Sequence, residues 1–125
     1  MSEYDAETAE ELAERVRDGD LRLYELEEHA DADTAAAARR LLVEEQSGAS
    51  LETTADYALD AEQASESAIE NMVGAAQVPM GVAGPVTIDG GAYDGETYLP
   101  MATTEGALLA SVNRGLSVID DSGGA

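Results

Sequence analysis

Carboxylate side chains outnumber cationic ones by 27 to 6 in this chain of 125 residues, which gives a net charge of −21. Any fold must keep those carboxylates in water and build its core from what remains. Leu, Ile and Val together number only 23, and alanine supplies another 23 of the residues counted as hydrophobic. Two classes of protein share these properties: intrinsically disordered chains, and folded proteins whose dense acidic surface is screened by molar salt.

The same charge excludes several classes of function. A surface this acidic repels phosphate, so nucleic-acid binding through a basic patch is excluded. No apolar run approaches the ~20 residues that a membrane span needs, and the N-terminus lacks the basic and apolar regions of a secretory signal. We therefore expect a cytoplasmic protein with no membrane span. Disulfide and thiol chemistry are absent, because the chain contains no cysteine.

Composition divides the chain near residue 70. Residues 1–70 carry 21 acidic and 5 basic side chains, whereas ten of the twelve glycines and all three prolines come later. Before that point, apolar spacing predicts short helices that need a partner surface, since their apolar stripes are narrow. These helices cover residues 7–16, 21–30, 34–46 and 61–73. The expected N-caps of the last three are Asp20, Asp33 and Asp60.

After residue 77 the pattern becomes that of strands. Apolar residues alternate over residues 78–82 and again over 86–88, on either side of a kink or bulge at Gly84 and Pro85. A turn signal, Asp-Gly-Gly, follows directly. Residues 98–102 are predicted to return as a second strand, which Pro100 restricts to an edge or a bulge.

A last helix is predicted after the second strand, with Thr103 or Thr104 as its N-cap. Its apolar face consists of Leu108, Leu109, Val112, Leu116 and Ile119. Helices followed by strand, turn, strand and helix predict an α+β fold. The agreement among these local signals argues against disorder.

Glu105 is the first candidate for chemistry, because it lies in the first turn of this predicted helix. A glutamate there ordinarily complements the helix dipole or joins a capping box, and spacing alone favours that interpretation. The alternative is a reacting carboxylic acid at a strand-to-helix junction. Desolvation by neighbours such as Met101 and Leu108 would favour its protonated form, which donates a proton.

Arg114 is the second candidate, since it is the only cation after Arg40. Its guanidinium either pairs with Asp120 or Glu105, or binds an anionic ligand such as a phosphate. Two neighbouring polar side chains, Ser111 and Asn113, are able to add hydrogen bonds.

Neither a metal site nor a dinucleotide site is predicted. His29 is expected on the surface, because no second His and no Cys would complete a transition-metal site, and no loop has EF-hand spacing. No Gly-x-Gly-x-x-Gly segment opens a helix. The glycines of the second part are instead interpreted as turn or bulge residues, or as points of close backbone approach: Gly81, Gly84, Gly90 and Gly91.

Three segments occur in a characteristic order: ENMVG at residues 70–74, PMGVAGP at 79–85 and PMATTEGALLASVNRG at 100–115. Together they resemble the 3-hydroxy-3-methylglutaryl-coenzyme A (HMG-CoA) reductase family. The resemblance implies a two-step, four-electron reduction of HMG-CoA to mevalonate and coenzyme A with two NADPH, in isoprenoid biosynthesis. It also implies that Glu105 is a catalytic acid, which reverses the interpretation favoured by spacing.

The resemblance implies roles for other residues. Ser111, Asn113 and Arg114 match positions that contact the coenzyme A ester, with Arg114 near its phosphates. The ENMVG segment, with Glu70, Asn71 and Gly74, matches an element at the contact of a dimer-based homo-oligomer, beside a shared active site.

Other parts of the family's sequences have no counterpart here. The catalytic lysine, aspartate and histidine and the nicotinamide-binding domain lie farther along, and this chain contains no lysine. The resemblance therefore implies an N-terminal fragment of a halophilic archaeal type of reductase, inactive alone. Its expected domains are a helical N-terminal domain at 1–69 and the start of the large substrate-binding domain at 70–125. The alternative is a non-enzymatic acidic binding or regulatory domain that keeps a reductase-like segment.

Overall fold

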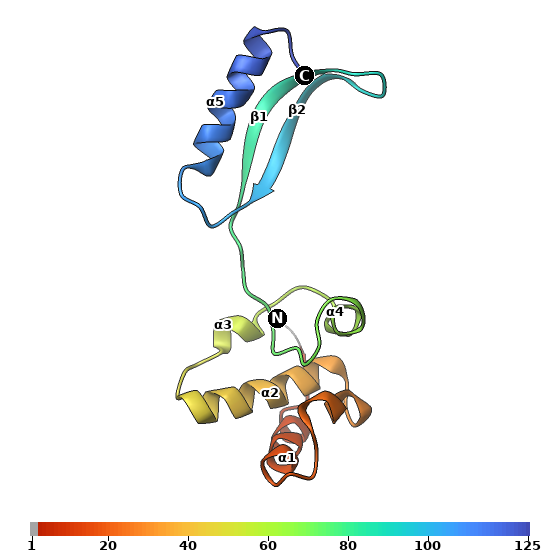
Figure 1. The fold of residues 1–125 in the computed structure, drawn as a ribbon. Coiled ribbons are helices and arrows are strands. Elements are labelled where there is room, and N and C mark those ends of the chain that lie inside the picture. Colours follow the sequence, from red (N-terminus) through yellow and green to blue (C-terminus); the bar gives the residue numbers. More distant parts are fainter. Residues whose placement is uncertain (1–2) are drawn as a thin grey trace. The chain divides into compact units, whose positions relative to one another are not determined.

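The computed structural model describes residues 3–125 and divides them into two compact units, one ending at Ala76 and the other spanning Gln77–Ala125. The first unit is helical, and the second consists of two antiparallel strands and a helix (Figure 1). The predicted α+β fold class is confirmed. The division falls a few residues after the predicted domain boundary at 69/70, which stays a prediction about the domains of a longer protein.

Two helices form the base of the first unit. Helix α1 spans Ala6–Arg17, and its N-cap Asp5 accepts hydrogen bonds from the N–H groups of Glu7 and Thr8. Helix α2 spans Ala32–Ser47 and ends at Gly48, whose left-handed φ of 73° terminates the helix. Both helices were predicted from apolar spacing and are confirmed, with Gly48 in its expected place.

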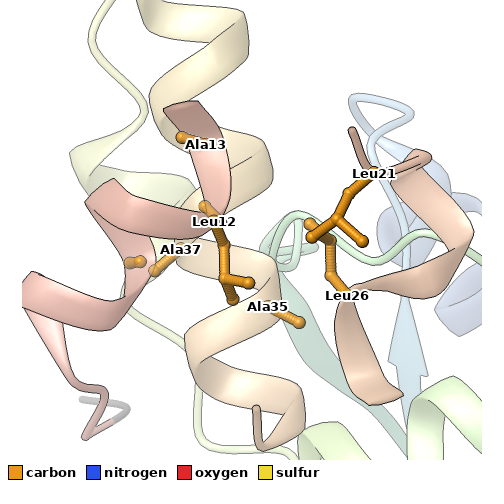
Figure 2. Packing of buried hydrophobic residues seen from close by; sticks show 8 residues of the cluster. Leu12, Ala13, Leu21, Leu26, Ala35 and Ala37 are labelled. Carbon is orange, nitrogen blue, oxygen red and sulfur yellow. The ribbon is translucent and has the colours of Figure 1, made fainter. Parts of the chain in front are cut away.

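The core of this unit consists largely of alanine. Figure 2 shows Leu12 and Ala13 of α1 facing Ala35 and Ala37 of α2, with Leu21 and Leu26 packed beside them. Small side chains let the two helix backbones approach closely, so a chain with few large apolar residues still encloses a dry core. This packing explains how a composition close to that of disordered chains forms a compact unit.

Two predicted N-caps are wrong. The second predicted helix is a 3₁₀ helix, η1 (Leu23–Glu28), that begins after Arg22, and Asp20 instead pairs with Arg15 at 2.8 Å. The cap of α2 is Asp31 rather than Asp33. The Asp33 carboxylate accepts a hydrogen bond from the Tyr57 hydroxyl at 2.6 Å, so tertiary contact determines which aspartate caps the helix.

The remainder of the first unit is less regular. Helix α3 (Glu52–Ala55) was not predicted, and α4 (Ala61–Ser67) begins at its predicted cap Asp60. Helix α4 ends several residues before the predicted end near Val73, because the chain from residue 68 leaves helical geometry to lie against α2 and α3. A second small core joins these elements through Ala32, Tyr57, Ala61 and Met72.

In the second unit, β1 (Met80–Asp89) pairs antiparallel with β2 (Asp94–Ala102). The register shifts between Ala83 and Val86, which confirms the predicted bulge. Gly84 has a φ of 109° there, and a Cβ at this position would lie 3.0 Å from the Thr97 carbonyl oxygen. Strand β2 starts earlier than predicted, and Pro100 lies opposite Val82 in a sheet whose strands are both edges.

Helix α5 (Leu108–Asp121) packs against β1 (Figure 1). Glycine at position 81 permits close approach, since a Cβ there would lie 2.0 Å from Cδ1 of Leu109 and would require that side chain to shift. No helix within residues 3–125 is both long enough and apolar enough to cross a membrane.

Candidate functional site

Glu105 lies in the loop between β2 and α5, and the prediction that it occupies the first turn of the helix is wrong. The Thr103 hydroxyl accepts a hydrogen bond from the Glu105 N–H at 2.9 Å, so it forms a local turn instead of capping the helix. Ala107 then has a left-handed φ of 67°, and α5 begins only at Leu108.

In this position, Glu105 cannot be explained as a residue that complements the helix dipole or joins a capping box. Because the residue lies outside the first turn, it neither belongs to a capping box nor faces the helix end in the predicted manner. Its side chain is exposed, so Met101 and Leu108 do not desolvate it within residues 3–125. The loop therefore presents an exposed carboxylate whose backbone is fixed by Thr103 and by the 3.4 Å bond from the Leu108 N–H to the Glu105 carbonyl.

The first turns of α5 carry the other predicted residues of this unit. Arg114 donates from Nη2 to the Ser111 hydroxyl at 2.9 Å, and both side chains are exposed. Asn113 is oriented differently, because its Oδ1 accepts the Gly84 N–H at 2.8 Å. That bond attaches α5 to the bulge of β1 and fixes which face of the helix carries Arg114.

The two predicted carboxylate partners of Arg114 do not bind it in the described chain. Asp120 accepts a hydrogen bond from the Thr87 N–H at 2.7 Å and so supports β1. Glu105 lies in the loop before the helix. Among the described residues, the Arg114 guanidinium forms no ion pair with a carboxylate, so its charge is available to an anionic ligand. This arrangement favours the second of the two interpretations drawn from the sequence.

Two arginines that sequence reasoning did not single out hold the ENMVG segment. Arg39 is 2% exposed and donates to the Met72 carbonyl at 3.2 Å, and Arg40 donates to the Val73 carbonyl at 2.8 Å. Both extend from α2. An adjacent pair of cations inside an alanine-rich helix of an acidic chain was the signal that could have identified them.

Arg39 also binds the 3₁₀ helix. Its guanidinium donates to both carboxylate oxygens of Glu27, at 2.7 and 2.5 Å, and to the carbonyl of Leu23 at 3.0 and 2.6 Å. Burial by itself raises the pKa of Glu27, but the hydrogen bonds and positive charge of Arg39 outweigh it and hold that pKa below its usual range. Arg39 thus joins η1, α2 and the ENMVG segment at one point.

Glu70 and Asn71 line a cavity of about 450 Å³ in the first unit. Exposed apolar side chains, Tyr24 and Ile69, form part of its wall together with Glu27. Gly74 lies against α3, where a Cβ would overlap the carbonyl oxygen of Thr54, and the neighbouring Ala75 N–H donates to that oxygen at 3.1 Å. The segment is therefore fixed by α2 on one side and by α3 on the other.

The predicted residues divide between the two units. Glu105, Ser111, Asn113 and Arg114 belong to Gln77–Ala125, whereas Glu70, Asn71 and Gly74 belong to the helical unit. His29 is exposed, as expected. Within residues 3–125, no group of three or more His, Asp or Glu side chains gathers as a metal site requires.

A nicotinamide dinucleotide phosphate does not fit the cavities described. The cavity of about 450 Å³ is lined by four glutamates, and another of about 550 Å³ is lined by Asp and Glu from five positions. Carboxylates at this density repel phosphate groups.

Comparison with known proteins identifies the sequence family. A sequence model of the hydroxymethylglutaryl-coenzyme A reductase family matches residues 35–125. The chain belongs to this family. The match begins inside α2 and includes Arg39 and Arg40, the ENMVG segment and all of the hairpin and α5.

Individual relatives agree with the family match. The chain is 74% identical over 117 residues to 3-hydroxy-3-methylglutaryl-coenzyme A reductase of Haloferax volcanii, and 60% identical to that of Halobacterium salinarum. Each alignment covers 94% of this chain and 29% of the relative. For 3-hydroxy-3-methylglutaryl-coenzyme A reductase 2 of Arabidopsis thaliana, identity is 42% over 99% of this chain and 22% of the relative. The chain therefore spans less than a third of the reductases it matches.

Proposed function

We propose that these 125 residues are part of an enzyme that reduces HMG-CoA to mevalonate and coenzyme A, at the expense of two NADPH. The observation that carries the proposal is the 74% identity to the Haloferax volcanii reductase over nearly the whole chain. Mevalonate is a precursor of isoprenoids, so the proposed place of the enzyme is isoprenoid biosynthesis. We infer a cytoplasmic enzyme, since the substrates are soluble and charged.

Glu105 is the proposed catalytic acid. Its carboxylate is exposed in the described unit, on a loop whose backbone is hydrogen-bonded to Thr103. A carboxylic acid in contact with the carbonyl oxygen of the substrate would supply the proton that forms the alcohol. Substrate binding itself would provide the desolvation that favours the protonated acid.

Arg114, Ser111 and Asn113 are the proposed contacts for the coenzyme A ester. Arg114 is the only cation of the second unit, and the Ser111 hydroxyl holds its guanidinium at 2.9 Å. A planar guanidinium suits a phosphate of coenzyme A because it donates two parallel hydrogen bonds. The Asn113 Oδ1 is occupied by Gly84, so its Nδ2 is the group proposed to donate to substrate.

The remaining parts of the proposal concern partners. We propose that Glu70, Asn71 and Gly74 contact a second copy of the enzyme in a dimer-based homo-oligomer. NADPH is assigned to regions outside these 125 residues, because the acidic cavities described here do not fit its phosphates. No step of the hydride transfer is therefore assigned to this chain, and residues 1–125 alone are expected to be inactive.

The test uses the product of the whole reading frame that contains these residues, assayed for HMG-CoA-dependent oxidation of NADPH in molar KCl. We expect turnover by the parent enzyme, and about a 10²- to 10⁴-fold lower kcat for Glu105→Gln, since the amide cannot donate the required proton. The matched control is Glu96→Gln, an exposed glutamate on β2 of the same unit, which should keep normal activity.

Each component of the proposal fails on a different result. A parent without reductase activity would leave the alternative of a non-enzymatic acidic binding domain. Normal activity of Glu105→Gln would remove the role of Glu105 alone. Turnover by residues 1–125 without the rest of the parent would show that the chain carries a complete site.

A further inference from the structure

Two hydrogen bonds place Thr103, in the loop before α5, between the start of β1 and Glu105. The Thr103 backbone N–H donates to the Pro79 carbonyl at 3.1 Å, and its side-chain Oγ1 accepts the Glu105 N–H at 2.9 Å. The first bond attaches the loop to the chain that enters β1, and the second carries this attachment to the proposed catalytic acid. Thr103 therefore connects Glu105 to the hairpin through one side-chain oxygen.

The two peptide groups that flank the Glu105 Cα are both held. The Glu105 N–H donates to Thr103 Oγ1, and the Glu105 carbonyl accepts the Leu108 N–H at 3.4 Å. Because peptide groups are planar, holding two successive planes also fixes the direction of the Cα–Cβ bond between them. The bond to Thr103 is the shorter of the two, and hydrogen bonds weaken as donor and acceptor separate. The Thr103 hydroxyl therefore contributes more to the direction of the Glu105 side chain.

The Glu105 carboxylate has no side-chain support of its own in the described unit. The side chain is exposed, and within residues 3–125 its carboxylate forms no hydrogen bond or ion pair. Helix α5 begins only at Leu108, after Ala107 in a left-handed conformation, so no helical turn fixes the backbone of Glu105. The position of this carboxylate depends instead on the local turn that Thr103 closes.

We propose that Thr103 is a positioning residue for the reductase reaction, whose hydroxyl oxygen holds the Glu105 backbone so that the acid meets the substrate carbonyl oxygen. This inference rests on the proposed function, because Thr103 acts through the proposed acid and is assigned no contact with substrate. A general acid must lie within hydrogen-bond reach of the atom that it protonates. A misplacement of about 1 Å is able to cost ~10²-fold in rate, so one hydrogen bond to the backbone is sufficient to change kcat.

Thr103→Val in the parent enzyme removes the acceptor and keeps the shape of the side chain. We expect kcat for HMG-CoA-dependent oxidation of NADPH to fall by about 10- to 100-fold with little change in KM for HMG-CoA, because a misplaced acid weakens the transition state and not substrate binding. Thr103→Ser keeps the oxygen and should retain nearly native kcat. A low kcat for Thr103→Ser with native kcat for Thr103→Val would overturn the proposal, since the methyl group would then be what matters.

Thr97→Val is the matched control. Thr97 lies on β2 of the same unit and is half-buried, as Thr103 is. Its hydroxyl makes only a 3.4 Å contact with the carbonyl of the next residue, and valine suits a strand. The control makes the same chemical change away from Glu105 and should keep native kcat and KM.

A double-mutant cycle separates positioning of the acid from general stabilisation of the unit. If Thr103 acts through Glu105, Thr103→Val should have its full effect on kcat in the native enzyme and almost none when Glu105→Gln is already present. A structural effect on the whole unit would instead multiply the loss caused by Glu105→Gln. An equal fold-loss of kcat in both backgrounds would overturn the proposal.

A further variant keeps the test decisive if Thr103→Val does not fold. Thr103→Ala removes the same oxygen and adds no atom, and its far-UV circular dichroism in molar KCl shows whether it is folded. Native kcat in either folded variant would overturn the role of Thr103 and leave the proposed function in place. A parent without reductase activity would overturn the proposed function, and this role with it.

Discussion

At the scale of single residues, the buried arginines of α2 explain how so acidic a chain is held together. Arg39 is almost fully buried, and its five donors reach Glu27 and two backbone carbonyls. A lysine presents a single point charge and could not span these partners. In this acidic chain, Arg39 is thus a rare cation that joins several segments through one side chain.

The pKa of Glu27 leads to a pH-dependent prediction. Because Arg39 lowers that pKa in the folded state, Glu27 stabilises the fold above its unfolded pKa of about 4.3, and the stabilisation is lost as pH falls through the lower folded value. Glu27→Gln leaves buried donors of Arg39 without their carboxylate and should lower the free energy of unfolding by about 2 kcal/mol at neutral pH. Below about pH 4 the difference from the native chain should shrink.

Urea unfolding of both proteins in molar KCl, from pH 7 to pH 3, measures this difference. Glu45→Gln is the matched control, since it removes a carboxylate from the exposed Arg17 pair and should cost less than about 1 kcal/mol. A Glu27→Gln difference that stays constant over this pH range would contradict the argument.

At the scale of elements, two side chains of α5 accept hydrogen bonds from backbone N–H groups of β1. Asn113 accepts from the Gly84 N–H and Asp120 accepts from the Thr87 N–H. These bonds attach the middle and the C-terminal end of the helix to one strand. They hold Ser111 and Arg114 on a helix whose orientation is fixed by β1.

Removal of one of these bonds should loosen the helix. Asp120→Ala leaves the Thr87 N–H without its carboxylate partner and should lower the free energy of unfolding by about 2 kcal/mol. The neighbouring Asp121→Ala, at an exposed position, should stay within about 0.5 kcal/mol of the native chain. Equal effects of the two variants, in thermal unfolding monitored by circular dichroism, would show that the Thr87 bond does not stabilise the unit.

The ENMVG segment permits a similar test of close packing. Gly74 has a φ of 151° and lies so close to α3 that a Cβ would overlap the Thr54 carbonyl oxygen. Gly74→Ala should therefore destabilise the helical unit by about 3 kcal/mol or more. Gly91→Ala has open space around it and should change the stability by no more than about 0.5 kcal/mol. Comparable unfolding midpoints for both variants would contradict the close approach.

Element boundaries show where sequence reasoning succeeded and where it failed. The bulge at Gly84 and the end of α2 at Gly48 were predicted, because each depends on a local conformational preference of glycine. The caps Asp20 and Asp33 were wrong, since the nearby Arg15 binds the Asp20 carboxylate and Tyr57 binds that of Asp33 across the fold. The start of α5 was wrong because Thr103 forms a local turn with the Glu105 N–H.

At the scale of the whole molecule, the net charge of −21 opposes compactness in dilute buffer. Two relatives with 74% and 60% identity come from the haloarchaea Haloferax volcanii and Halobacterium salinarum, which agrees with a fold adapted to high salt. The alanine core between α1 and α2 is small. The unit folds only if the free energy gained by burying this core exceeds the electrostatic repulsion among the surface carboxylates.

Salt should therefore increase the folded population. We expect the far-UV circular dichroism of the chain to show more helix in molar KCl than in dilute buffer, because screening removes self-repulsion from the compact state. A titration in KCl at neutral pH provides the measurement. A spectrum independent of salt would contradict adaptation to high salt.

The sequence by itself determined the fold class, the bulge, most helices and the family, because these depend on local patterns and on motifs in series. Tertiary structure alone decided that Arg39 binds Glu27, that Tyr57 binds Asp33, and that Arg39 and Arg40 hold the carbonyls of Met72 and Val73. Those outcomes depend on residues far apart in the chain competing for the same few donors. The chain has six arginines and no lysine, and the acceptors that these few arginines bind are decided only when the helices pack.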